Sequence, residues 1–184
     1  MSLKLRPPLI KDPLFYEYPR TTWQDATSPH PTVRFLLARH RGFRNRLADI
    51  SETTRDVLGS KLSPPAFCVS LAQELHYFIP QLEGHHLAES QRLYPSLIQF
   101  HPAAQARFET LESDHKAIDT LLAQIARVPE DLMNDAPTQD IFFTKAKAFA
   151  TLLSDFESSL LRHLEDEEDL VVPILLKMNL SLEL

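Results

Sequence analysis

Apolar residues recur at intervals of three and four along four long stretches of the chain, a spacing that places them on one face of an α-helix. The stretches cover about residues 31–58, 65–100, 102–127 and 138–178. Between the last two, residues 129–137 are polar and acidic without periodicity, which predicts the longest loop of the fold. Because short connections make successive helices antiparallel, the pattern predicts an all-α fold: an up-down-up-down antiparallel four-helix bundle with its stripes facing inward.

Each apolar stripe contains a histidine where the bundle core is expected. His40 and His115 lie on the first and third stripes, and both have apolar residues at positions −7, −4, +3, +7 and +10. On the second and fourth stripes the histidine is followed by a glutamate four residues later and a proline ten residues later: His85, Glu89 and Pro95; His163, Glu167 and Pro173. The chain therefore reads as two helix pairs with the same layout.

These six polar residues have the chemistry of a metal site. Residues four apart on a helix lie on one face, so each histidine and the glutamate that follows it can bind a transition metal together. Two buried carboxylates without compensation would each cost several kcal/mol, and neutral imidazoles cannot neutralise them. Divalent cations can, so the sequence predicts a metal centre in the core. The predicted ligands are His40, His85, Glu89, His115, His163 and Glu167.

More ordinary interpretations exist for single members of this set. A lone histidine on an apolar stripe is more often a hydrogen-bonded core residue, and a His-x-x-x-Glu pair is common on exposed helix faces. His86 neighbours His85 and precedes Glu89 by three residues, so it is the alternative ligand on the second helix. The match with the fourth helix favours His85. We expect His86 to point outward or to support a ligand from behind.

Further acidic residues near the predicted ligands could orient them through hydrogen bonds. We expect this role for Asp166 and Glu168, which belong to the acidic run 165–169, and Asp119 is another candidate. Such a run would ordinarily be a solvated helix face.

Residues 1–30 differ in composition from the predicted bundle, residues 31–184. With Pro31 they include six of the fourteen prolines of the chain, which predicts an extended arm and not a helix throughout. Four aromatic residues indicate that this N-terminal arm packs against something: Phe15, Tyr16, Tyr18 and Trp23. Its partner is either the bundle or a second subunit, so a homodimer through the arm is one of two alternatives.

Composition and charge exclude several classes of partner and of metal site. The net charge of −6 disfavours nucleic acids and anionic membranes as partners, because both attract cationic surfaces. No apolar run approaches the roughly 20 residues that span a bilayer. The single cysteine, Cys68, excludes an internal disulfide and a cysteine-rich zinc or iron–sulfur site, and it fits a reducing compartment. We therefore expect a soluble cytoplasmic protein.

The ordered set of motifs resembles the hemerythrin-like (HHE cation-binding) family over nearly the whole chain from about residue 30. The residues that carry the resemblance are His40, His85-x-x-x-Glu89 with Leu93-Tyr94-Pro95, His115, and His163-x-x-x-Glu167-Glu168 with Pro173. The family implies a four-helix bundle with a non-haem di-iron centre, in which two carboxylates bridge the irons and the histidines bind terminally. Its members bind dioxygen or nitric oxide, act as sensors, or handle iron under oxidative and nitrosative stress.

The chain departs from two branches of that family. Oxygen carriers have a His-x-x-x-His pair on the third helix, but the residue four after His115 is Asp119. Carriers also end in a histidine followed by an aspartate, where this chain has His163 and Glu167. A branch linked with repair of iron centres is closer in its ligands but carries a cysteine-bearing N-terminal module, which Cys68 does not replace. Family analogy alone therefore assigns neither role.

We predict a di-iron protein that binds or senses a small diatomic ligand, dioxygen or nitric oxide. Two six-coordinate metals offer about twelve positions, of which the predicted ligands fill about eight, so positions remain for outside ligands. The alternatives are a di-iron redox enzyme or iron-handling protein in oxidative or nitrosative stress, and a metal-stabilised interaction module. Manganese or zinc would also suit these ligands, and a binding role is favoured over an enzymatic one.

Overall fold

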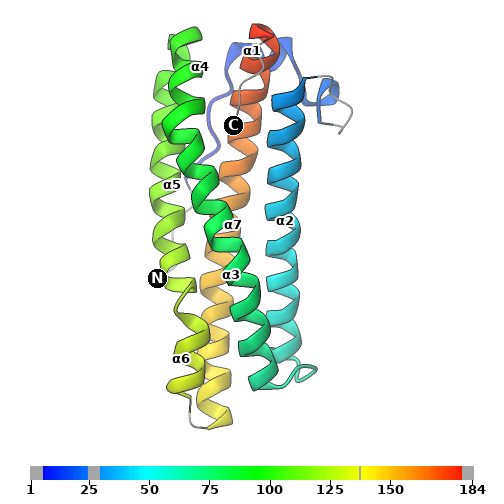
Figure 1. The fold of residues 1–184 in the computed structure, drawn as a ribbon, viewed down its shortest axis with the longest axis vertical. Coiled ribbons are helices and arrows are strands. Elements are labelled where there is room, and N and C mark those ends of the chain that lie inside the picture. The colour runs from blue at the N-terminus through cyan, green and yellow to red at the C-terminus, as the bar shows by residue number, and fades with distance from the viewer. Residues whose placement is uncertain (1–5, 25–29, 137, 180–184) are drawn as a thin grey trace.

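The computed structural model describes residues 6–24, 30–136 and 138–179, and all regular secondary structure in these ranges is helical. The prediction of an all-α fold is thus confirmed. The long helices pack side by side as rods along the long axis of the molecule (Figure 1). The rods are α2 (Pro31–Leu58); α3 (Pro64–Ala88) with the π-helical turn η2 (Glu89–Leu93) and α4 (Tyr94–Phe100); η3 (Pro102–Ala104) with α5 (Gln105–Ile125) and α6 (Val128–Asn134); and α7 (Gln139–Met178). None of the described helices combines the length and apolarity that crossing a lipid bilayer demands.

Helix boundaries follow local signals in the sequence. Ser63 and Thr138 cap α3 and α7, because each side-chain oxygen accepts a hydrogen bond from the backbone N–H three residues on. Proline occupies the first turn of both α2 and α3, where its missing N–H has no intrahelical partner to lose. Asn179 adopts the left-handed conformation, with a φ of 50°, and ends α7. Such local signals are why the predicted stretches agree closely with these helices.

Two parts of the second and third rods differ from the prediction. The segment 129–137 is not the predicted loop, because α6 occupies most of it. Pro129 and two acidic residues suit the first turn of a helix, and Leu132 is buried against the bundle. The stretch 65–100 is not one regular α-helix, because the wider π turn η2 interrupts it. Where this turn passes into α4, the adjacent residues Leu93 and Tyr94 are both buried.

Two apolar clusters fill the core, one on each side of a polar layer. The larger cluster includes Phe43, Leu82, Ile118 and Leu164, and the smaller cluster includes Leu36, Leu93, Leu111 and Leu170. On every rod the predicted ligands lie between a residue of one cluster and a residue of the other, as His115 lies between Leu111 and Ile118. The clusters therefore exclude water from both sides of the polar layer.

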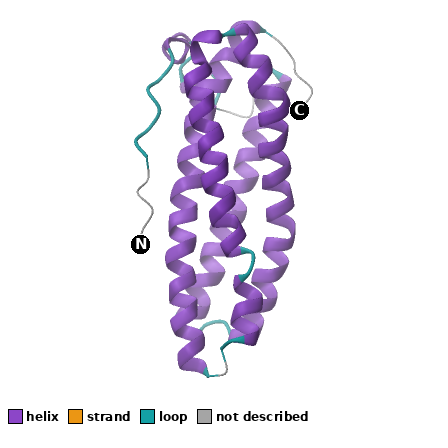
Figure 2. Cartoon of the chain, turned by 90° about the vertical axis from the view of Figure 1, so that its left-hand side faces the viewer, coloured by secondary structure: helices purple, strands orange, loops and turns teal. Residues whose placement is uncertain are grey.

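Residues 6–24 of the N-terminal arm lie against the bundle of the same chain. Figure 2 shows the segment running along the outside of the helices before its first helical turn. Two short helices interrupt it, α1 (Pro13–Glu17) and η1 (Arg20–Thr22), so the described part is not extended throughout. Helix α1 packs against α7, and Trp23 is buried in the smaller cluster. At least these residues therefore have their packing partner within the chain.

Candidate metal centre

All six predicted ligands are buried in the polar layer, and each rod contributes at least one of them. Helix α2 supplies His40 and helix α5 supplies His115, while the other two rods supply the His-x-x-x-Glu pairs. The burial of the acids is the most demanding feature, since the exposed fractions of Glu89 and Glu167 are 2% and 0%. Such burial is costly unless a cation or hydrogen bonds compensate the carboxylates.

Four of these residues form one group around a common point, which we call the four-residue group: His40, His85, Glu89 and Glu167. One ligand atom of each lies within 4.8 Å of those of the others. The two imidazole Nε2 atoms are 3.1 Å apart. His85 Nε2 lies 2.9 Å from Glu89 Oε1, and His40 Nε2 lies 3.2 Å from Glu167 Oε2. This convergence of ring nitrogens and carboxylate oxygens could hold one metal ion.

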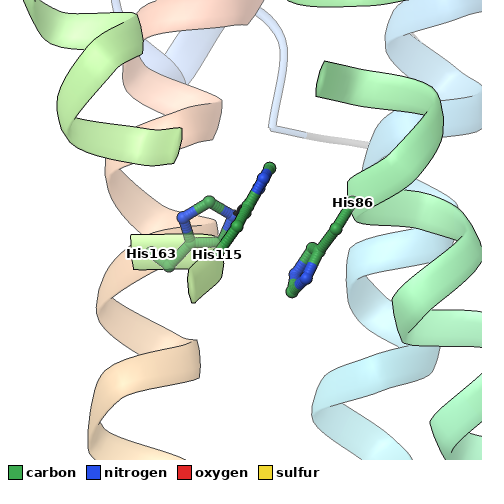
Figure 3. A group of neighbouring side chains, drawn as sticks. All are labelled: His86, His115 and His163. Atoms are coloured by element: carbon green, nitrogen blue, oxygen red, sulfur yellow. Dashed lines mark hydrogen bonds between the residues drawn. The ribbon is translucent and has the colours of Figure 1, made fainter. Parts of the chain in front are cut away.

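A second group consists of three imidazoles, which we call the three-histidine group: His86, His115 and His163. His115 Nε2 lies 3.2 Å from His163 Nε2. Figure 3 shows His86 extending from α3 toward the other two histidines. Its ring stacks on that of His115, with 4.1 Å between the ring centroids. The expectation that His86 points outward is therefore wrong. It follows Leu82 by four residues and precedes Glu89 by three, a helical spacing in the sequence that could have indicated its burial.

The glutamates lie between the two groups. Glu89 directs Oε1 toward His85 and Oε2 toward His115, at 2.9 and 3.5 Å. Glu167 Oε2 is 3.2 Å from His40 and 3.8 Å from His163 Nε2. Each carboxylate thus touches an imidazole of both groups. That is the arrangement expected of residues that bridge two neighbouring ions.

Several buried polar atoms of this layer have no hydrogen-bond partner among the described residues. They are both carboxylate oxygens of Glu89, Oε2 of Glu167, Nε2 of His86 and Nδ1 of His163. A buried polar atom without a partner costs about 1–3 kcal/mol, and more when it is charged. Bound cations would engage the oxygens and the Nε2 lone pair, so the residues present fit a metal centre.

Burial sets the protonation of the layer. The pKa of the Glu89 carboxyl lies well above its usual range, because burial and then the nearby Glu167 disfavour its charged form. Burial is also the main reason that the pKa of His115 falls to about 2 and that of His85 falls well below its usual value. For His40, burial lowers the pKa, but the adjacent carboxylates of Glu167 and Glu168 outweigh it and raise the value. Mostly neutral imidazoles beside an acid that needs a counter-charge favour cation binding.

Oxygen atoms lie within hydrogen-bond distance of the far ring nitrogens of three of the histidines, His40, His86 and His115. The Nδ1 of His40 lies 3.0 Å from Glu168, and the Nδ1 of His86 lies 3.2 Å from Asp119. Two of the three predicted supporting acids therefore lie behind an imidazole. Asp166, the third predicted acid, instead accepts a hydrogen bond from Arg6 at 2.7 Å. An Nδ1–H that is held from behind leaves the Nε2 lone pair facing the centre.

Sequence reasoning missed three supporting residues. Ser90 Oγ lies 3.2 Å from the Nδ1 of His115, and Asp114 Oδ2 lies 3.7 Å from the Nδ1 of His163. The buried Tyr94 donates its hydroxyl to Glu167 Oε1 at 3.0 Å. Their sequence signal is weak, because serine and aspartate are common on exposed helix faces and a tyrosine on an apolar stripe resembles any core aromatic.

Comparison with known proteins identifies the domain. The family model described as the hemerythrin HHE cation binding domain matches residues 32–175, a range that contains every residue of both groups. No curated protein and no solved structure matches the chain.

Proposed function

The chain belongs to the hemerythrin HHE cation-binding family, and from this premise we propose that it is a non-haem di-iron protein that binds or senses dioxygen or nitric oxide. The family implies binding of a cation, usually iron, and the residues of both groups suit that role. The number of ions and the diatomic ligand are our proposal. It takes residues 31–184 as an up-down-up-down bundle with the N-terminal arm outside it, acting in the cytoplasm.

Glu89 is the observation that carries the proposal of two ions. Its carboxylate is buried, neither oxygen has a hydrogen bond, and the oxygens lie at 2.9 and 3.5 Å from imidazoles of different groups. One bound ion would satisfy one of these groups and leave the other beside an uncompensated buried acid. Two ions with Glu89 between them compensate both.

The proposed ligands divide between the two positions: His40 and His85 at one, His115 and His163 at the other, with Glu89 and Glu167 shared. His86 is a further candidate at the second position, because Asp119 holds its Nδ1 and leaves its Nε2 buried without a partner. Since the ligand lone pair lies in the ring plane, His86 and the stacked His115 could share an ion only after one ring turns.

A ferrous pair held here would supply the electrons and the open coordination positions that dioxygen or nitric oxide requires. The protein contributes a dry and fixed environment. Phe43 of the larger apolar cluster packs against the four-residue group, with its ring centroid 5.0 Å from that of His85, and Phe78 packs against Phe43. The Tyr94 hydroxyl donates to Glu167 and so fixes the orientation of a shared carboxylate. These contacts limit both access of water and movement of the ligands.

Metal analysis of anaerobically purified protein, followed by optical spectra under dioxygen and nitric oxide, tests the proposal. We expect about two irons per chain and, after dioxygen, near-ultraviolet absorption typical of a bridged ferric pair. Preparations that remain substantially iron-free after incubation with ferrous iron would contradict it. Manganese or zinc in place of iron would contradict the gas-binding role, and repeated turnover of a diatomic substrate with an electron donor would identify an enzyme instead of a binder.

A further inference from the structure

Most of the acidic run on α7 is buried, although a solvated helix face was expected. Asp166, Glu168 and Asp169 have exposed fractions of 6%, 4% and 8%, and Glu165 alone in the run 165–169 is exposed. The N-terminal arm covers Asp166, Glu168 and Asp169. Arg6 binds Asp166, and Arg20 binds both Glu168 and Asp169. The arm therefore places two arginines beside the helix turn that carries a predicted ligand pair.

Arg6 connects the arm to the three-histidine group through Asp114. The Arg6 Nε donates to Asp114 Oδ1 at 2.8 Å, and its Nη2 also contacts Oδ2 of that carboxylate. The same Oδ2 lies 3.7 Å from the Nδ1 of His163, whose Nε2 faces His115 at 3.2 Å. A guanidinium that binds a carboxylate with two donors fixes its plane as well as its position.

Arg20 connects the arm to the four-residue group through Glu168. Its Nη1 donates to Glu168 Oε2 at 3.2 Å, while Oε1 of that carboxylate lies 3.0 Å from the Nδ1 of His40. The Nε2 of His40 faces His85 at 3.1 Å. Arg44 on α2 also donates to Glu168 Oε1, at 2.7 Å. Glu168 therefore contacts two arginines, Arg20 and Arg44, whereas Asp114 contacts one arginine among the described residues, Arg6.

We infer that the N-terminal arm is part of the metal centre, in which Arg6 and Arg20 are positioning residues that hold His163 and His40 through Asp114 and Glu168. The inference rests on the proposed function, since it assigns a role toward bound metal. A carboxylate fixed by an arginine beside a histidine Nδ1 favours the tautomer with the proton on Nδ1, through a hydrogen bond for His40 and through the charge of Asp114 at 3.7 Å for His163, so Nε2 remains free for the ion. Each arginine acts on a different ion, and release of that ion is slower while the arm is docked.

Release of iron to excess chromogenic ferrous chelator, from the full-length chain loaded anaerobically, tests the inference. We expect two release phases in the unmodified protein. Arg6→Ala should accelerate one phase by about tenfold, the lower end of the effect of removing a partner behind a ligand. Arg20→Ala should accelerate the other phase by a smaller factor, because Arg44 still holds Glu168.

Lys177→Ala is the matched control. It removes an ion pair between α7 and the arm, in which Lys177 Nζ lies 2.7 Å from Glu17 Oε1, and neither residue contacts the metal centre. Both release phases should keep their rates. Arg6→Lys, which retains the charge but loses the two-donor geometry, should restore part of the slow release. Asp114→Asn breaks the same connection from the bundle side, so it should accelerate the phase that Arg6→Ala accelerates, and the two changes should not add.

Three outcomes would overturn the inference. Unchanged rates in both arginine variants would show that the arm does not act on the metal. Equal acceleration of both phases in each variant, together with a matching loss of stability in the metal-free protein, would show that the arm only supports the fold. An unmodified chain that holds no iron would overturn the proposed function as well, whereas two tightly bound irons with unchanged release in the variants would overturn this inference alone.

Discussion

Glu89 and His86 show how much of this protein depends on single side chains in the polar layer. Glu89 is buried with two carboxylate oxygens that lack hydrogen bonds, and burial holds the pKa of its carboxyl well above the usual range. His86 is buried with an unpartnered Nε2 and an Nδ1 held by Asp119. Both residues cost stability in the absence of metal and both have atoms that a cation would satisfy.

Glu89→Gln should remove most bound iron while leaving the metal-free fold intact. The amide is nearly isosteric but carries no charge, so it cannot compensate two cations, and the loss of affinity should exceed the roughly 100-fold limit for residues behind a ligand. The metal-free variant should be at least as stable as the unmodified protein, because a buried acid is gone. Iron content and urea unfolding measure the two effects. Glu83→Gln, an exposed acid on the same helix, is the control and should change neither.

His86→Asn should weaken the ion at the three-histidine group by about 10–100-fold and leave the other ion bound. Asparagine is too short to reach the position of the imidazole Nε2. Competition with a chelator of known affinity measures the change, and the exposed His76, substituted in the same way, provides the reference. Two ions held with the affinity of the unmodified protein would show that His86 is no ligand.

At the scale of elements, two features position the site: the π turn η2, which interrupts a regular helix, and the N-terminal arm, which covers part of α7. The π turn η2 starts at Glu89, three residues after His86, the second of the two adjacent histidines of α3. Such turns are frequent at functional sites because they redirect side chains without ending a helix. The described part of the arm is held by the buried Trp23 and by Asp12, which contacts His101 and Arg107. These contacts hold the arm in the position in which Arg6 and Arg20 reach the acidic residues of α7.

Trp23→Ala should release the arm from the bundle. Trp23 is 1% exposed, and its Nε1–H donates to the Tyr18 carbonyl at 2.8 Å. Loss of this side chain from the smaller cluster should lower the free energy of unfolding by about 3–5 kcal/mol. Faster tryptic cleavage after Arg20, with helical circular dichroism retained, would show that the arm detaches before the bundle unfolds. The exposed Tyr16, changed to alanine, should show neither effect.

On the scale of the whole molecule, the polar layer ties stability to pH and to metal. A core divided by buried imidazoles and acids is weaker than a continuous apolar core, unless cations occupy the layer. The pKa values of the individual histidines shift in different directions. Burial depresses the pKa of His85, His86 and His115, whereas adjacent glutamate carboxylates raise that of His40.

The metal-free protein should lose stability as the pH falls below neutrality. The pKa of His115 is about 2 in the folded protein and about 6.5 in an unfolded chain, so between these values the unfolded state binds more protons. The contribution of His115 to the free energy of unfolding therefore rises with pH across this window and falls as the pH drops through it, by up to about 1.4 kcal/mol per pH unit, whereas the raised pKa of Glu89 gives a contribution of opposite sign. Urea unfolding at pH 7 and pH 5 measures the slope. His115→Gln should flatten it, and an unchanged slope would contradict the assignment.

Helical periodicity is a local property, which is why the all-α class, the positions of the long helices and the polar layer could be predicted from the sequence. The 3.6-residue repeat places His40, His85, His115 and His163 on apolar stripes whatever the rest of the chain does. Capping residues such as Ser63 act within one helical turn, so they too are legible in the sequence.

Which other groups meet this layer depends on the packing of the helices and the arm against one another. The inward position of His86, the burial of most of the acidic run and the role of Asp114 depend on contacts between distant segments; Arg6 and Asp114 are 108 residues apart. The π turn and α6 likewise depend on side chains that pack against other rods. Single-sequence patterns carry no information about such pairs, because the free energy that selects them comes from burial and electrostatics between elements and not from the backbone of any one element.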